Sequence, residues 1–147
     1  MREPTSPSAA TASPRPQGFF PSLAYGDAER AVDWLEVAFG FELIFSVPGD
    51  GGGVLHAELR TLEGDIIMVL STQLSTRRSR SPRSLGGTAQ SVYLVTSDVD
   101  GLHERAAGAG AEVFNRPRDT GYGREFCCLD PEGHIWTFGT YRPDASI

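Results

Sequence analysis

Three polar side chains, in two equivalent places of the chain, are the residues best suited to chemistry. His56 and Glu58 lie two positions apart in a predicted strand, so their side chains share one face of it. Glu125 occupies the position of His56 in a second copy of the surrounding pattern. A histidine beside carboxylates can transfer protons near neutral pH. On the concave face of a sheet these residues would form an acid–base cluster, whereas on the outer face they would be solvated polar residues.

The repeat of that pattern defines the organisation of the chain. Asp130-Pro131-Glu132-Gly133 supplies a tight turn between two apolar segments, as in a β-hairpin. Glu63-Gly64 has the same place in an earlier hairpin, about 70 residues upstream. Two helical stretches, which begin at Asp27 and Asp98, precede the hairpins at a similar offset. The repeat predicts two units of strand, helix, strand, strand and strand, and therefore an α+β fold.

The sequence divides into a tail, two units and a linker. Residues 1–17 are rich in Pro, Ser, Ala and Thr without periodicity, which is typical of a disordered tail. The first unit is expected at 18–71, a linker loop at 72–90 and the second unit at 91–141. The expected strands are 19–25, 41–47, 54–61, 65–71, 91–96 and 112–115, followed by the hairpin at 124–141; the helices end at Gly40 and Gly110, and loops are expected at 48–53 and 116–123.

Length and charge limit the classes of partner. The 147 residues are enough for one domain with a core, and the net charge of −6 disfavours nucleic acid and anionic membranes as partners. No apolar run approaches the length of a membrane span, which is about 18 residues. The N-terminus lacks the apolar segment of a secretory signal, so a cytoplasmic location is expected. The adjacent Cys127 and Cys128 predict neither a disulfide with each other nor a zinc site.

Two units of this kind resemble the vicinal oxygen chelate superfamily, which includes glyoxalase I, extradiol dioxygenases and the bleomycin-resistance proteins. The motifs that carry the resemblance are Gly26-Asp27-Ala28-Glu29-Arg30-Ala31 at the start of the first unit and Asp130-Pro131-Glu132-Gly133-His134 in the last hairpin. The resemblance covers about residues 18–141. It implies two βαβββ repeats that form a curved mixed sheet around a ligand cavity, the glyoxalase/bleomycin-resistance fold. It also implies a homodimer, in which the two units of one chain either close on each other or pair with those of a second chain.

The resemblance further identifies four positions at which metalloenzymes of the superfamily place their metal ligands. In this chain these positions hold Phe20, Met68, Ser91 and Thr137. A divalent metal of this kind needs imidazole or carboxylate donors, and none of the four side chains supplies one. The adjacent positions contain no His, Asp or Glu either. We therefore expect the superfamily's fold without its metal site and without a cofactor.

Strand alternation from these four positions predicts the lining of the cavity. Trp136, next to Thr137, and Tyr122, in a nearby loop, are added as aromatic candidates, although both also suit packing roles. The lining is mainly apolar and aromatic with a few hydroxyls, which suits a small hydrophobic or planar ligand; the alternative is a barrel filled by its own side chains. The predicted ligand-binding residues are Phe20, Ser22, Met68, Ser91, Tyr93, Tyr122, Trp136 and Thr137.

Three functions follow, in order of preference. The first is a metal-free binding protein of the bleomycin-resistance kind, which sequesters a small organic molecule such as an antibiotic or another secondary metabolite. The second is a metal-independent enzyme in which His56, Glu58 or Glu125 transfers protons. The third is a glyoxalase-type lyase or a dioxygenase, which requires metal ligands that the expected positions lack.

Overall fold

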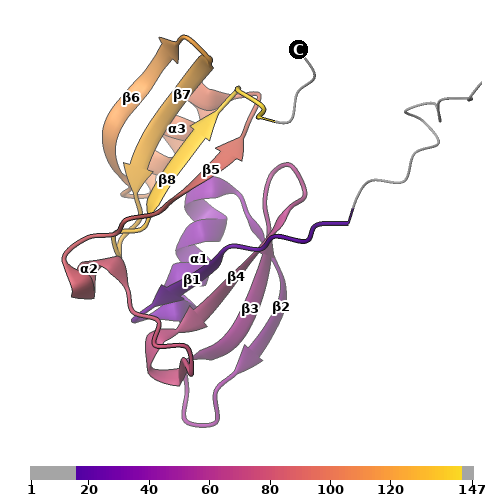
Figure 1. The fold of residues 1–147 in the computed structure, drawn as a ribbon, viewed down its shortest axis with the longest axis vertical. Helices are drawn as coiled ribbons and strands as arrows, with labels where there is room; N and C mark the ends of the chain where they lie inside the picture. The colour runs from indigo at the N-terminus through magenta and orange to yellow at the C-terminus, as the bar shows by residue number, and fades with distance from the viewer. Residues whose placement is uncertain (1–15, 144–147) are drawn as a thin grey trace, which may run out of the picture.

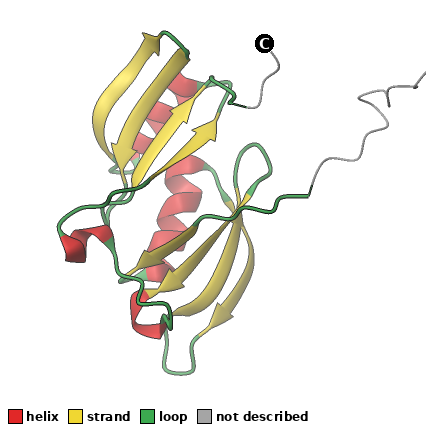
Figure 2. Cartoon of the chain, in the orientation of Figure 1, coloured by secondary structure: helices red, strands yellow, loops and turns green. Residues whose placement is uncertain are grey.

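The chain folds into two units of the same architecture, each a four-stranded sheet with one long helix (Figure 1). The computed structural model describes residues 16–143. The first unit contains β1 Ser22–Tyr25, α1 Ala28–Phe39, β2 Glu42–Pro48, β3 Val54–Arg60 and β4 Ile66–Ser71. The second contains β5 Ser91–Val95, α3 Val99–Gly108, β6 Glu112–Thr120, β7 Gly123–Leu129 and β8 Ile135–Gly139. Between the units lie the 3-10 turn η1 Thr72–Leu74 and the short helix α2 Pro82–Leu85 (Figure 2). The predicted α+β fold of two repeats is confirmed.

The strand order is the same in both sheets. The first sheet runs β1-β4-β3-β2 and the second β5-β8-β7-β6. The pairs β1–β4 and β5–β8 are parallel, and the others are antiparallel. The first strand of each unit can lie parallel to the last because a helix carries the chain back before the antiparallel strands begin. As a result, Ser22 stands opposite Met68 and Tyr93 stands opposite Thr137, which brings predicted site residues onto neighbouring strands.

Both long helices begin at the predicted caps. The Asp27 carboxylate accepts a hydrogen bond from the Arg30 backbone N–H at 3.1 Å, and the Asp98 carboxylate accepts one from the Gly101 N–H at 3.0 Å. Helix α1 ends at Gly40, whose φ of 73° is left-handed and favours glycine. These local signals explain why both helices could be predicted from the sequence.

One core lies between the helices and the adjoining faces of both sheets. Phe39, at the end of α1, packs against the rings of Trp136 and Phe138 on β8, with ring centroids 5.1 and 4.7 Å apart. Trp34 on α1 donates from Nε1 to the Ala109 carbonyl, which follows α3, at 2.7 Å. Because a helix of the first unit packs on the sheet of the second, the two units share one core and are held in a fixed arrangement.

The turn between β7 and β8 also joins the two units. The buried Asp130 carboxylate accepts hydrogen bonds from the Tyr25 hydroxyl at 2.7 Å and from Trp136 Nε1 at 3.0 Å. Its other oxygen accepts from the backbone N–H groups of Glu132 and His134 and so fixes the turn. Burial and then the charge of Asp130 raise the pKa of Tyr25 well above its ordinary value, so the hydroxyl stays a donor.

Two further side chains of this turn reach the first unit. The Glu132 carboxylate accepts hydrogen bonds from the backbone N–H groups of Gly26, at 2.6 Å, and Asp27, at 3.0 Å. His134 donates from Nε2 to the Ala24 carbonyl at 2.8 Å. The Asp-Pro-x-Gly turn therefore holds the end of β1 and the start of α1.

The sequence predicts a loop at 116–123, and this prediction is wrong. Strand β6 continues to Thr120 and turns directly into β7 at Gly123. Pro117 lies within a register shift between Asn115 and Arg118. At such a bulge the ladder is interrupted, so a residue without an N–H is tolerated inside the strand.

The predicted tail and linker also differ from the structure. Residues 1–15 of the predicted disordered tail lie outside the described residues. Gln17, the last residue of the predicted tail at 1–17, is hydrogen-bonded to Ile66 and belongs to the folded part. The linker at 72–90 is not a plain loop, because it contains η1 and α2.

Candidate functional site

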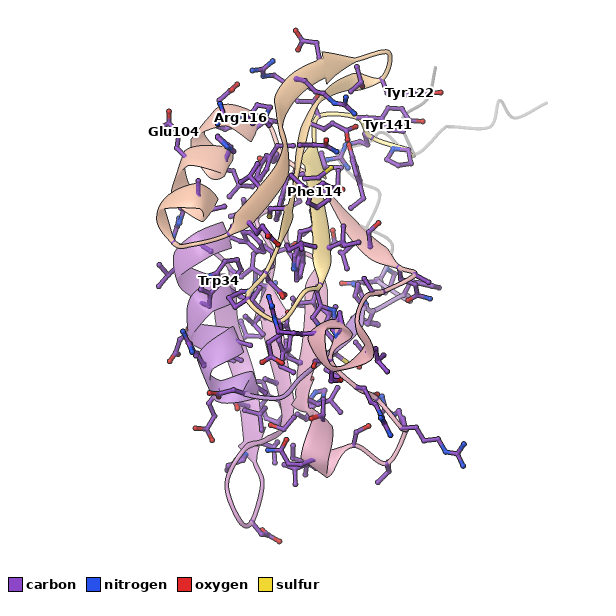
Figure 3. The ribbon with its side chains drawn as sticks, turned by 90° about the vertical axis from the view of Figure 1, so that its left-hand side faces the viewer. Trp34, Glu104, Phe114, Arg116, Tyr122 and Tyr141 are labelled. Carbon is purple, nitrogen blue, oxygen red and sulfur yellow. The ribbon has the colours of Figure 1, made fainter. Side chains whose placement is uncertain are left out.

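Each sheet has one face in the core and one face away from the long helices α1 and α3, which lie together on one side of the chain (Figure 3). On β3, Ala57 and Leu59 are buried in the core, and His56 and Glu58 alternate with them on the other side. Met68 stands opposite Glu58 and shares its face. We call this surface the first open face; it carries Ser22, Phe45, His56, Glu58, Ile66, Met68 and Leu70.

His56 and Glu58 form a hydrogen-bonded pair on the first open face. His56 Nε2 lies 2.7 Å from Glu58 Oε2, and each side chain is 35% exposed. The Phe45 ring meets the imidazole edge-on, with centroids 6.0 Å apart. When the imidazole is neutral and donates from Nε2 to the carboxylate, Nδ1 is left as an acceptor. The pair can therefore accept a proton from a ligand or hold a polar group of one.

The second sheet shows the same alternation. Phe126 and Cys128 on β7 and Trp136 and Phe138 on β8 are buried in the core. The residues that alternate with these along β7 and β8 point to the opposite face of the sheet, away from the core. We call that surface the second open face; it carries Ser91, Tyr93, Glu125, Cys127, Leu129, Ile135 and Thr137.

The polar groups of the second open face differ from those of the first. Cys127 Sγ lies 3.2 Å from Thr137 Oγ1 and 3.8 Å from Glu125 Oε2, so the thiol can donate to that carboxylate. The Tyr93 hydroxyl donates to the Tyr141 carbonyl at 2.6 Å. Partial burial and then the charge of Glu125 raise the pKa of Tyr93, which keeps this hydroxyl protonated. The face offers hydroxyls and one carboxylate to a ligand.

Both cysteines are free thiols that point to opposite faces. Burial, followed by the charge of Asp130, raises the pKa of Cys128 to about 12, so this core thiol is protonated and unreactive at neutral pH. Cys127 belongs to the second open face.

A groove of about 360 Å³ lies between the edge strands β1 and β5 of the two sheets, near their starts. It brings together Ser22 from the first unit and Ser91 and Tyr93 from the second, three of the predicted ligand-binding residues. A second groove, of about 780 Å³, adjoins it along β5. Phe19, Pro21, Val92 and Tyr93 line both grooves. The residues that line the smaller groove are Phe19, Pro21, Ser22, Leu23, Thr88, Gln90, Ser91, Val92, Tyr93, His134 and Ile135.

Phe20, Tyr122 and Trp136, also predicted to bind the ligand, line neither groove. Phe20 precedes β1 and is 41% exposed. Tyr122 lies at the tip of the β6–β7 hairpin, 74% exposed, with its ring 5.4 Å from that of Tyr141 (Figure 3). Trp136 belongs to neither open face, because it is fully buried on the core side of β8, where alternation places it opposite to Thr137. The prediction that Trp136 neighbours the ligand therefore does not match its position.

The predicted three-residue acid–base cluster does not form within one chain. His56 and Glu58 lie together on the first sheet, and Glu125 lies on the second. Between 16 and 143, no hydrogen bond or ion pair links Glu125 to either of them. The two halves of the predicted cluster belong to different open faces.

The four positions that hold metal ligands in the superfamily's metalloenzymes do not fit a metal here. Phe20 offers no donor atom, Met68 offers a thioether, and the remaining two, Ser91 and Thr137, offer neutral hydroxyls. Among the described residues, no group of three His, Cys, Asp or Glu side chains is placed to hold a metal ion. The donor set therefore supports no step through a metal.

Sequence reasoning missed two functional features. The inter-unit role of Asp130 and Glu132 could not be read from their turn motif, because their partners Tyr25 and Gly26 lie more than a hundred residues away. Gln17 was assigned to the tail because its composition gives no strand signal; its side chain, not its backbone, makes the contact with Ile66.

Comparison with known proteins agrees with this geometry. The model of the Glyoxalase/Bleomycin resistance protein/Dioxygenase superfamily matches residues 20–138. The uncharacterized protein Rv0887c of Mycobacterium tuberculosis is 36% identical over 122 residues, which cover 81% of this chain and 71% of that protein. The uncharacterized protein Mb0911c of Mycobacterium bovis is also 36% identical over 122 residues, 80% of its own length.

Two solved structures have a similar fold. TioX from Micromonospora sp. ML1 has a TM-score of 0.68 and 35% identity, covering 85% of this chain and all of that one. TnmS3, described as an antibiotic binding protein from Streptomyces sp. CB03234, has a TM-score of 0.65, with 89% of this chain and all of that one covered. At 21% identity the latter shows a shared fold alone.

Proposed function

Because the chain belongs to the Glyoxalase/Bleomycin resistance protein/Dioxygenase superfamily, we propose that it is a metal-free binding protein for a small, hydrophobic or planar organic molecule. The observation that carries the proposal is the groove between β1 and β5, lined by apolar side chains and hydroxyls. The open faces add Phe45 and Met68 as apolar contacts and the His56–Glu58 pair as a polar anchor.

The class of ligand is part of this proposal. TnmS3, which shares the fold, is described as binding an antibiotic, so an antibiotic or another secondary metabolite is the first class to test. Hydroxyls of Ser22 and Ser91 would orient polar groups of the ligand, while Tyr93 would pack on its ring. The action would be sequestration in the cytoplasm. No helix within residues 16–143 is long and apolar enough to cross a membrane.

We further propose that the protein acts as a homodimer in which each open face is covered by a second chain. The shared core fixes both sheets through their helix sides, and this leaves both open faces uncovered in one chain. Phe45 is 51% exposed on the first open face, and Tyr93 is 36% exposed on the second. Covering such apolar side chains favours association. Pairing of the first open face of one chain with the second of its partner would also unite His56 and Glu58 with Glu125.

A second function, proton transfer without a metal, is favoured by one observation. His56 and Glu58 are hydrogen-bonded at 2.7 Å on an accessible surface, an arrangement in which the carboxylate orients an imidazole general base. In this alternative Nδ1 of the neutral imidazole accepts a proton from the substrate, and Glu58 stabilises the resulting cation.

Ligand binding can be tested with N-phenyl-1-naphthylamine, a neutral planar fluorophore whose emission rises in apolar sites. We expect saturable binding with one probe per site. Ile135→Asp, which places a charge in the smaller groove, should weaken binding at least tenfold, because an ionised carboxylate disfavours an apolar ligand. Glu104→Gln, an exposed change on α3 at the helix side, is the control. Absence of saturable binding in the unmodified protein would contradict the proposal.

The two functions can be separated with one further pair of variants. His56→Ala in a binding protein changes ligand affinity and nothing else. In an enzyme, the same variant would retain affinity and lose turnover of a bound molecule, measured by mass spectrometry of the ligand before and after incubation. His103→Ala, on the helix side of the second unit, is the matched control.

A further inference from the structure

The segment just before β1, residues 17–21, is fastened to β4 at two points; we call it the arm. Its first attachment is the primary amide of Gln17. The Ile66 backbone N–H donates to Gln17 Oε1 at 2.7 Å, and Gln17 Nε2 donates to the Ile66 carbonyl at 2.9 Å. The side-chain amide thus pairs with Ile66 as the backbone of a neighbouring strand would. The second attachment is a hydrogen bond from the Met68 N–H to the Pro21 carbonyl, at 2.9 Å.

Between its two attachments the arm does not continue strand β1, which begins only at Ser22; we call this part of the arm, residues 18–20, the bow. Ile66 and Met68 are two positions apart on β4, whereas Gln17 and Pro21 are four positions apart. The residues between them lie outside the β1–β4 ladder, whose first pair is Ser22 and Met68. Gln17 Nε2 also donates to the Phe19 carbonyl at 2.8 Å, so a hydrogen bond within the arm stabilises the bow. A polar side chain with its oxygen and nitrogen both engaged indicates a fixed conformation.

The bow presents an aromatic side chain to the grooves between the units. Phe19 is 90% exposed, although it lies on a segment fixed at both ends. It lines both the 360 Å³ and the 780 Å³ groove, together with Tyr93 on the facing strand β5. An apolar ring that is exposed although its segment is attached at both ends contributes little to the core, so its place is explained by what enters the groove.

We propose that the arm is a wall of the ligand site and that Phe19 determines specificity by stacking on a planar ligand held between it and Tyr93. The inference rests on the proposed binding function and names a residue outside the predicted site. The hydroxyls of Ser22 and Ser91 in the same groove select ligands that carry polar groups at the ring edge. Gln17 acts as a positioning residue, because it fixes the arm without lining the smaller groove.

The first test is binding of N-phenyl-1-naphthylamine to Phe19→Ala and Phe19→Trp. Loss of a stacked ring should weaken binding by about tenfold in the alanine variant, whereas the tryptophan variant should bind at least as well as the unmodified protein. Val37→Ala, which removes an exposed apolar side chain from α1, is the control and should have no effect.

The second test addresses the attachment by hydrogen exchange. In Gln17→Ala the Ile66 amide loses its acceptor and should exchange faster, and probe affinity should fall by a smaller factor than in Phe19→Ala. Gln17→Glu sets a carboxylate oxygen against the Ile66 and Phe19 carbonyls in place of a donor, so Ile66 should also exchange faster than in the unmodified protein.

The outcomes are distinguishable. Equal probe affinity of Phe19→Ala and unmodified protein would overturn the inference and leave the binding function standing. Weakened dimerisation in Phe19→Ala, measured by sedimentation, with unchanged probe affinity would also overturn it and assign the ring to a second copy of the chain. Absence of probe binding in the unmodified protein would reject the binding function and this inference together.

Discussion

Thr61 and Asp130 hold the same position in the two units, 69 residues apart, and their surroundings differ completely. Both precede a turn with the same backbone hydrogen bonds, in which the third residue after each donates back to its carbonyl at 3.0 Å. Asp130 is buried and its carboxylate accepts four hydrogen bonds, two of them from Tyr25 and Trp136. Thr61 is also buried, but its hydroxyl has no partner among the described residues. The repeat thus preserves the backbone of the turn, whereas the side chain at this position joins the two units at Asp130 and not at Thr61.

The open faces show the same division. His56, Glu58 and Met68 in the first unit correspond to Glu125, Cys127 and Thr137 in the second. Glu58 stands opposite Met68, as Cys127 stands opposite Thr137. The positions that carry the imidazole–carboxylate pair His56–Glu58 on the first sheet therefore carry a carboxylate–thiol pair, Glu125–Cys127, on the second. Repetition specifies where side chains point, and the individual residues specify the chemistry.

Replacement of Asp130 should produce the largest effect on stability. Asp130→Ala leaves the Tyr25 hydroxyl and the Trp136 N–H buried without an acceptor, which should lower the free energy of unfolding by about 3–5 kcal/mol. Urea denaturation measures the change. Asp130→Asn, which keeps one acceptor oxygen, should lose less, and equal losses in both variants would contradict the assigned hydrogen bonds.

Alkaline pH should destabilise the second unit through Cys128, whose counterpart in the first unit is the apolar Leu59. The pKa of Cys128 is raised in the folded protein, to about 12 from 9.0. The folded state then holds a proton that the unfolded state loses, so this stabilisation is complete below pH 9 and falls as the pH rises toward 12. Cys128→Val should flatten the fall in unfolding free energy in that range. An unchanged slope in the variant would contradict the burial of the thiol.

Removal of the Tyr25 hydroxyl should have a smaller effect. Tyr25→Phe keeps the packing of the ring and deletes one hydrogen bond to a charged group, so the free energy of unfolding should fall by about 1.5–3 kcal/mol. Combining it with Asp130→Ala in a double-mutant cycle should give a total below the sum of the single losses. Strict additivity would show that the two side chains do not interact.

The smallest change is expected at Thr61. Thr61→Val replaces an unpaired buried hydroxyl with a methyl group of similar size, so stability should stay within about 1 kcal/mol of the unmodified protein, with the sign favouring the variant. The midpoint of thermal unfolding checks this. A clear loss of stability would show that the hydroxyl is hydrogen-bonded after all.

The fold could be predicted further than the site, for physical reasons. Asp27, Asp98 and Gly40 act locally, through caps and a left-handed residue, so the helices followed from sequence. Strand alternation predicted that Met68 and Thr137 point away from the core, as they do. The same alternation implies that Trp136 points into the core, although it is counted among the predicted ligand-binding residues. The extent of β6 was missed because a bulge tolerates Pro117.

Contacts between segments that are distant in the sequence could not be predicted from sequence patterns. The contact between Asp130 and Tyr25, the pairing of Gln17 with Ile66 and the groove that unites Ser22 with Ser91 depend on segments that meet only in the folded chain. The sequence likewise does not show which face of β3 is open, because this depends on the face that α1 covers.

The central claim, a metal-free protein that binds a small organic molecule, is tested most directly by native mass spectrometry of protein purified without chelators and mixed with N-phenyl-1-naphthylamine. We expect a dimer whose mass contains no stoichiometric metal and increases by a whole number of probe molecules, with saturation. A stoichiometric divalent metal on the dimer would contradict it, because Phe20, Met68, Ser91 and Thr137 could not then be the positions that decide the chemistry of this site.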